Sequence, residues 1–177
     1  MTKRVVLLRH AKAERPARIA DFDRPLTARG YADAGAAGAW LAHGGHLPSV
    51  VICSPAKRTR QTWHGVALAM AEAPAAKAGV ETEAGGGPVV SYEPDVYEGD
   101  ARELLDLIRA VDPAAAVVLL IGHNPSISGL SRLLDPVSAD PDGLRTSGIA
   151  VHRLAVPEWA QLSPSRGPVE AAHTARS

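Results

Sequence analysis

The sequence predicts an α/β sandwich, because short apolar runs alternate along the chain with longer segments that are compatible with helices. Each run has the length of a strand, and its wholly apolar character is typical of a strand buried on both faces. Arginine, histidine and glycine residues follow several of these runs directly. In open α/β sheets ligands bind outside the carboxyl ends of the strands, so these polar residues mark the edge where a site is expected.

The N-terminal part of the chain is expected to contain one strand and one helix. Residues 4–8 are the first expected strand, with an apolar run over residues 5–8, and residues 11–26 are polar and irregular. Thr27 suits the N-cap of a helix that continues over the alanine-rich residues 31–42. Two consecutive glycines follow and are expected to end this helix.

The middle of the chain repeats this alternation. Residues 49–53 are a second expected strand, and Ser54 with the following proline turns the chain into a helix over residues 57–73. Residues 74–88, which include three consecutive glycines, are expected to be a loose loop. A short strand is expected over residues 89–92.

The C-terminal part continues the pattern as far as residue 154. Asp100 is suited to cap a helix over residues 101–111, whose leucines and isoleucine form an apolar stripe. Residues 116–121 are the most apolar expected strand, a helix is expected over residues 126–134, and a last strand over residues 149–154. Proline, serine, glycine and alanine dominate from residue 157 onward and periodicity disappears. We therefore expect one domain over residues 1–156 and a flexible tail over residues 157–177.

Composition excludes several classes of function. The 177 residues suffice for one domain, and the 19 Lys and Arg residues equal the 19 Asp and Glu residues in number. No net field is therefore available to attract nucleic acid or a membrane surface, and any anion site must be local. The single cysteine, Cys53, excludes an internal disulfide and a cysteine-rich zinc site. Without a signal-peptide core or a bilayer-spanning run, a cytoplasmic protein is expected.

Three strand ends carry residues suited to phosphate chemistry. Arg9 and His10 follow the first strand, Arg58 lies in the segment after the second, and His123 follows the most apolar strand. If these strands are parallel neighbours, two arginines and two histidines converge on one point. Such a cluster of positive charge is unfavourable unless an anion occupies it, and arginine binds phosphate in a planar fork. The sequence therefore predicts a phosphate pocket.

The same residues suggest a covalent mechanism. Nearby arginines lower the pKa of His10 and keep its imidazole neutral, and a neutral imidazole can attack phosphorus. A backbone carbonyl that accepts from its other ring nitrogen would fix the tautomer. Arg9 and Arg58 would hold the phosphoryl oxygens, while His123 would donate to one of them. No metal and no cofactor is expected to be required.

Other phosphatase and metal signatures do not fit the chain. Asp21 and Asp23 form an Asp-x-Asp sequence, but no buried strand precedes them. Four residues separate Cys53 from Arg58, whereas cysteine phosphatases need five. No nucleotide-binding glycine motif is present, and a metal site at His43 and the histidine three positions later would lack further ligands.

In their order along the chain, the three segments together resemble the histidine phosphatase superfamily, which has the phosphoglycerate mutase-like fold. The Arg9-His10 pair resembles the family's Arg-His-Gly signature, with Ala11 in place of glycine, and residues 54–62 and 122–125 are similar to its second and third motifs. The length and the sequence Asp-Arg-Pro-Leu-Thr at residues 23–27 resemble the SixA-type phosphohistidine phosphatase branch. The resemblance, over about residues 3–155, implies a three-layer α/β/α sandwich with a mixed, mostly parallel sheet and one antiparallel strand. It also implies that His10 is the nucleophile.

The general acid is open at this stage. Larger family members use a carboxylate to protonate the leaving oxygen, and Glu98 lies in the corresponding region. Glu98 could instead be a carboxylate that stabilises the start of a helix. Asp21 and Asp23 are alternatives, and Arg24 could line the rim of the pocket. A phosphohistidine substrate would place less demand on an acid, because its P–N bond is labile and imidazole is a better leaving group than an alkoxide.

We therefore expect a metal-independent phosphatase that acts through a phosphohistidine enzyme intermediate. By resemblance, protein phosphohistidine is the favoured substrate, and a small phosphate ester is the alternative. A non-catalytic module that binds phosphorylated proteins is the competing class of function. A mutase is disfavoured, because the short chain has little sequence left over for a domain that closes the site.

Overall fold

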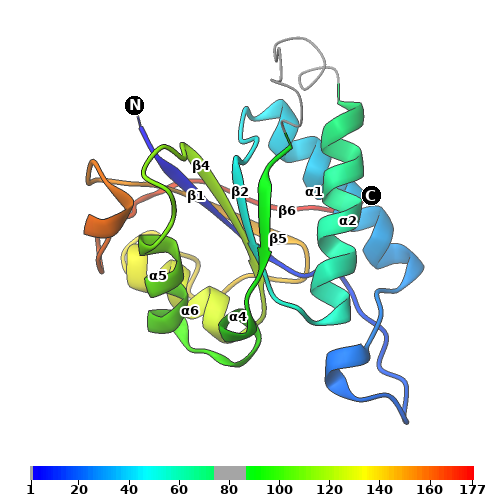
Figure 1. Ribbon diagram of the computed structural model, residues 1–177. Helices are drawn as coiled ribbons and strands as arrows, with labels where there is room; N and C mark the ends of the chain where they lie inside the picture. The colour runs from blue at the N-terminus through cyan, green and yellow to red at the C-terminus, as the bar shows by residue number, and fades with distance from the viewer. Residues whose placement is uncertain (1, 74–86) are drawn as a thin grey trace.

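The computed structural model describes residues 2–73 and 87–177, which form a six-stranded sheet between two layers of helices (Figure 1). The expected loop over residues 74–88 lies almost wholly outside this range. The strands are β1 (Arg4–Arg9), β2 (Val50–Cys53), β3 (Val89–Tyr92), β4 (Val117–Gly122), β5 (Gly148–Arg153) and β6 (Val169–Thr174). Their spatial order is β3-β2-β4-β1-β5-β6. Only β5 runs against the other strands, so the mixed, mostly parallel sheet is confirmed.

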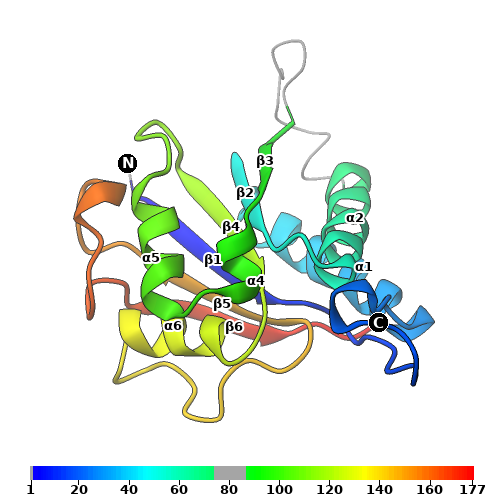
Figure 2. The same cartoon turned by 60° about the horizontal axis from the view of Figure 1, so that its bottom comes forward.

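The helices cover both faces of the sheet, as expected for a three-layer sandwich (Figures 1 and 2). The helices are α1 (Ala28–His43), α2 (Lys57–Glu72), α4 (Pro94–Glu98), α5 (Ala101–Arg109) and α6 (Ser126–Leu134), with 3-10 turns η1 (Asp21–Asp23) and η2 (Trp159–Gln161). Helices α1 and α2 pack together on one face, and α5 and α6 pack together on the other. In the part of the chain that the structure describes, no helix is long and apolar enough to cross a membrane.

Strand β1 lies at the centre of the sheet, and its side chains pack against the helices on both faces. Val5 and Leu7 belong to the apolar cluster beneath α5 and α6, whereas Val6 and Leu8 belong to the cluster beneath α1 and α2. All four side chains are fully buried. A strand with a core on each side must be apolar at every position, which is why the run carries no alternation of polar and apolar residues.

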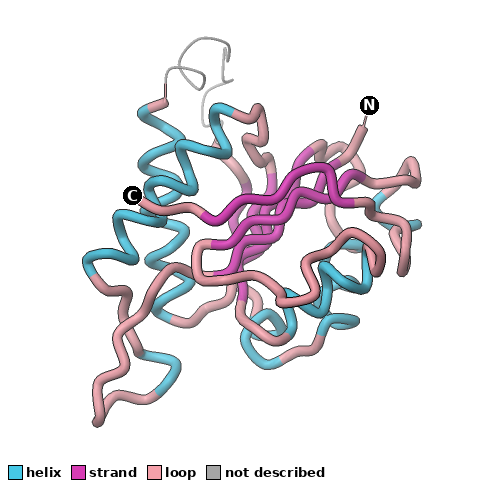
Figure 3. The backbone as a smooth tube through the Cα atoms, turned by 180° about the vertical axis from the view of Figure 1, so that it is seen from behind, coloured by secondary structure: helices cyan, strands magenta, loops and turns pink. Residues whose placement is uncertain are grey.

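The expectation of a flexible tail over residues 157–177 is wrong. Trp159 is buried and donates from Nε1 to the carbonyl oxygen of Ala115 at 2.8 Å. Strand β6 pairs antiparallel with β5 and extends the sheet, as the tube view from behind shows (Figure 3). The segment lacks periodicity because it relies on one aromatic anchor and on backbone pairing with the edge of β5 rather than on an apolar face. Residues that follow β6 therefore return to the body of the protein.

Candidate active site

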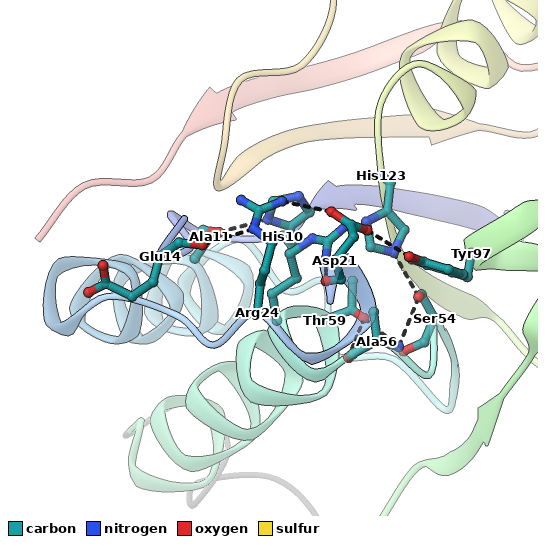
Figure 4. A network of polar contacts seen from close by, with 11 residues as sticks. His10, Ala11, Glu14, Asp21, Arg24, Ser54, Ala56, Thr59, Tyr97 and His123 are labelled. Atoms are coloured by element: carbon teal, nitrogen blue, oxygen red, sulfur yellow. Dashed lines mark hydrogen bonds and ion pairs between the residues drawn. The ribbon is translucent and has the colours of Figure 1, made fainter. Parts of the chain in front are cut away.

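The register of the sheet brings the two predicted histidines together. Strands β1 and β4 are parallel neighbours with Arg9 opposite Gly122, so His10 and His123 leave the sheet side by side. The centroids of their rings lie 5.3 Å apart. On the other side of β4, strand β2 ends at Cys53 opposite Ile121, which places Ser54 next to His123 (Figure 4). The convergence expected of these strand ends is present in the fold.

A cavity of about 960 Å³ opens above these strand ends. Its lining residues are Arg9, His10, Lys12, Ala13, Arg15, Asp21, Arg24, Arg29, Asp33, Arg58, Tyr97, His123, Asn124, Thr146 and Arg176. The two histidines and two arginines of the predicted phosphate pocket are all among them. Arg24, expected at the rim, also lines the cavity.

The imidazole of His10 is held in one tautomer. Its Nδ1 lies 2.7 Å from the carbonyl oxygen of Ala11, and because a carbonyl can only accept, Nδ1 carries the hydrogen and Nε2 has the lone pair. Burial lowers the pKa of His10 to about 4, the Ala11 contact opposes this shift, and the charges of Arg58 and Arg9 add to it. At neutral pH the ring is therefore uncharged, with a nucleophilic nitrogen available.

His123 uses the opposite ring nitrogen for its internal contact. Its Nε2 lies 2.7 Å from the hydroxyl oxygen of Ser54, and this oxygen accepts a hydrogen bond from the backbone N–H of Ala56 at 3.2 Å. The donor in the Ser54 contact is set by the tautomer of His123: when the hydroxyl donates to Nε2, Nδ1 carries the hydrogen. Burial, followed by the charges of His10 and Arg58, lowers the pKa of His123 to about 3. A neutral His123 can thus serve as a hydrogen-bond donor.

Three buried side-chain nitrogens on residues that line the cavity have no hydrogen-bond partner within the described residues. They are Nε of Arg9, Nε of Arg58 and Nδ1 of His123. The arginines are anchored by their outer nitrogens, Arg9 to the carbonyl oxygen of Leu144 at 3.2 Å and Arg58 to Asp21. Buried polar groups are normally paired, so unpaired nitrogens on three residues that line one cavity support an anion site there.

Asp21 organises the wall of the cavity. Its backbone oxygen and its Oδ2 accept from Arg58 at 2.6 and 2.9 Å, and its Oδ1 accepts from Arg24 at 2.9 Å. The hydroxyl of Tyr97 donates to Oδ2 at 2.6 Å (Figure 4). The Tyr97 hydrogen bond above all, then those from Arg24 and Arg58, holds the pKa of Asp21 well below its usual range. The carboxylate is therefore ionised and orients Arg58 instead of donating a proton.

Comparison with known proteins identifies the family. Residues 5–81 match the model of the histidine phosphatase superfamily, branch 1. An uncharacterized protein of Mycobacterium tuberculosis is 33% identical over 179 residues, which cover 96% of this chain and 100% of the relative. A structure from Nakamurella multipartitia, described as a candidate phosphohistidine phosphatase SixA, is 31% identical and superposes with a TM-score of 0.72, over 99% of this chain and 97% of that one. The chain belongs to the histidine phosphatase superfamily. A second candidate SixA structure, from Agrobacterium tumefaciens, is 28% identical with a TM-score of 0.74, over 97% of each chain.

In this histidine phosphatase, Ala11 makes two backbone contacts at the position where the first motif has glycine. Ala11 is fully buried, its N–H donates to the hydroxyl of Thr62 at 3.0 Å, and its carbonyl oxygen holds His10. Both backbone contacts are independent of the side chain, and the methyl group fits into the apolar cluster beneath α1 and α2. The departure from glycine is therefore compatible with a phosphatase site.

The candidate acids expected from the sequence are mostly not brought to the cavity of the phosphatase. Glu98 is exposed at the end of α4 and does not line the cavity, and Asp23 is exposed in η1 and does not line it either. The two carboxylates that do line it are Asp21 and Asp33. Tyr97 was missed by sequence reasoning, because a single tyrosine in a five-residue helix has no recognisable pattern.

Proposed function

We propose that this phosphatase hydrolyses phosphohistidine in a protein substrate by way of a phosphorylated His10. The observation that carries the proposal is the fixed ring of His10, whose Nδ1 donates to the Ala11 carbonyl and which lines the cavity together with Arg9 and Arg58. An enforced tautomer and a low pKa are the properties that an imidazole nucleophile requires at neutral pH.

In the first step, the lone pair of His10 Nε2 attacks phosphorus and the P–N bond to the substrate imidazole breaks. The substrate imidazole takes up a proton from solvent at its second nitrogen before the bond breaks, so that it departs as neutral imidazole. The side chains of Arg9, Arg58 and His123, which line the cavity, would hold the phosphoryl oxygens as charge spreads over them. In the second step, a water oxygen attacks phosphorus, the bond to Nε2 breaks, and the water proton leaves with inorganic phosphate or solvent.

The carboxylates of the cavity favour phosphohistidine over an alkyl phosphate. An alkoxide needs a proton as it leaves, but Asp21 is held ionised by Tyr97, Arg24 and Arg58. Asp33 is buried and already accepts from Arg29 and from the backbone of Ser177. A labile P–N bond makes the weaker demand on general acid catalysis.

The experiment is to trap the intermediate with a peptide that carries radiolabelled phosphohistidine. We expect an acid-labile, alkali-stable adduct after rapid quenching, no adduct in His10→Ala, and a normal adduct in His64→Ala, a control at an exposed histidine outside the cavity. Turnover is expected to persist in EDTA, because arginines supply the positive charge, and vanadate is expected to inhibit. Label on His10→Ala, or a strict requirement for a divalent metal, would overturn the proposal. Hydrolysis of small phosphate esters in preference to the peptide would reassign the substrate.

A further inference from the structure

The cavity carries more positive charge than one phosphoryl group can neutralise. Seven lining side chains are cationic and two are carboxylates. The cations are Arg9, Lys12, Arg15, Arg24, Arg29, Arg58 and Arg176. A phosphoryl group brings about two negative charges, so an excess of about three positive charges remains. The whole chain has equal numbers of acidic and basic residues, so this excess is a property of the site and not of the composition.

The two carboxylates are already engaged. Asp21 pairs with Arg24 and Arg58, and Asp33 lies 3.3 Å from Arg29 and 3.8 Å from Arg176. Within residues 2–73 and 87–177, neither Lys12 nor Arg15 forms an ion pair. These two exposed cations are therefore available to a ligand.

A buried carboxylate holds the residues of the outer part of the cavity in place. Asp33, in α1, is only 2% exposed and accepts from the backbone N–H of Ser177 at 2.9 Å. This contact fixes the segment after β6 against α1 and holds Arg176 beside Arg29, with side chains that are 41% and 59% exposed. A buried carboxylate is unfavourable unless it is paired, so the cluster maintains its own geometry. The exposed guanidinium groups stay accessible from the cavity.

The cations of the outer part of the cavity influence the residues of the phosphate pocket. Burial first, then the charges of Arg15 and Arg58, lowers the pKa of Arg9. Gly30 of α1 approaches the segment that carries Lys12 so closely that a Cβ there would lie 2.1 Å from the Lys12 carbonyl oxygen. A phosphoryl group fills a small part of a cavity of about 960 Å³, a volume that accommodates a much larger ligand.

We propose that Lys12, Arg15, Arg29 and Arg176, here called the outer cations, form a second anion subsite. This subsite binds a carboxylate or phosphate that belongs to the same substrate as the reacting phosphoryl group. In a protein substrate the second anion is an acidic side chain near the phosphohistidine. The inference rests on the proposed function, since it assigns the substrate class of the same site.

The test compares two phosphohistidine peptides that differ only in their flanking residues, glutamate in one and glutamine in the other. We expect kcat/KM to be about fivefold higher for the acidic peptide at low salt, the size of one or two partly exposed ion pairs, and the ratio to fall as salt rises. In the double variant Lys12→Gln/Arg15→Gln the ratio is expected to approach one. The control Lys57→Gln/Arg102→Gln removes two exposed cations from outside the cavity and is expected to retain the ratio.

A second substrate pair separates the two sources of the anion. An alkyl bisphosphate is compared with the matching monophosphate in the same variants. If only the acidic peptide is preferred over its glutamine counterpart, the subsite binds acidic side chains. If only the bisphosphate is preferred over the monophosphate, the subsite binds a second phosphate of a small molecule. A kcat/KM ratio near one in both substrate pairs would overturn the subsite while leaving the phosphatase proposal intact. So would an equal fall of the ratio in Lys12→Gln/Arg15→Gln and in the control Lys57→Gln/Arg102→Gln. Absence of turnover and of the His10 adduct with every substrate would overturn both.

Discussion

The floor and the wall of the cavity are held in place in different ways. The floor consists of His10, His123 and Ser54, buried residues that follow β1, β4 and β2 and are positioned by the register of the sheet. The wall includes η1 and Tyr97 and is held by ionic and hydrogen-bonding contacts of Asp21, whose side chain is 54% exposed. The position of the floor residues is set by backbone pairing, whereas the wall depends on side-chain contacts that a single substitution can remove.

The strongest challenge to this comparison is Arg58→Ala, because Arg58 lines the cavity and is oriented by the wall. Its Nε has no partner within the described residues, and its outer nitrogens donate to Asp21. We expect kcat/KM on a phosphohistidine peptide to fall by about 10²–10³, or ~3–4 kcal/mol of transition-state stabilisation, as for loss of one oxyanion donor. Arg60→Ala, at an exposed position on the same helix, is the control. A loss below tenfold would remove Arg58 from the pocket.

Asp21→Asn tests the wall alone. The substitution keeps the shape but removes the charge that orients Arg58, so we expect kcat to fall about tenfold, in line with a charged hydrogen bond worth ~1.5 kcal/mol. The loss of a negative charge beside the phosphate means that KM is not expected to rise. Steady-state kinetics separate the two parameters. A rise in KM with unchanged kcat would show that Asp21 contributes to binding and not to the orientation of Arg58.

The burial of the floor predicts a dependence of stability on pH. The pKa values of His10 and His123 fall from an ordinary 6.5 to about 4 and about 3 in the folded protein. Between pH 6.5 and 4 the unfolded chain binds more protons than the folded one, so the free energy of unfolding decreases as the pH falls through this window. Denaturant titrations from pH 7 to pH 5 measure this decrease, and it is expected to be smaller in His10→Gln. An unchanged slope in this variant would contradict a buried, neutral His10.

The smallest effect is expected at Glu98. Its side chain is exposed and lies outside the cavity, so Glu98→Gln is expected to change kcat/KM by less than twofold on both a phosphohistidine peptide and an alkyl phosphate. A selective loss on the alkyl phosphate would restore Glu98 as the general acid and would show that α4 moves when substrate binds.

The floor could be predicted from the sequence because strand ends have local signatures. An apolar run that stops at Arg9 and His10, and another that stops before His123, locate both residues at one edge of a parallel sheet. The wall could not be predicted in the same way. Asp21 and Tyr97 are 76 residues apart, and their contact is made by exposed polar side chains with no periodic pattern.

The last strand was missed for a related reason. Strand β6 is mostly exposed and contains two alanines, so neither composition nor alternation marks it as a strand. Its pairing depends on the available edge of β5, which is a property of the assembled sheet. Because the path of the chain after β6 depends on this pairing, the sequence does not predict that Arg176 lines the cavity.

The central position of β1 constrains how the protein is made. Its two neighbours are β4, which begins at Val117, and β5, which begins at Gly148. A ribosome therefore synthesises β1 before either of its neighbours, and this strand stays without its native pairing until β4 and β5 have been synthesised. During that interval the apolar side chains of β1 are exposed, so chaperones are expected to bind this strand until β4 and β5 pair with it.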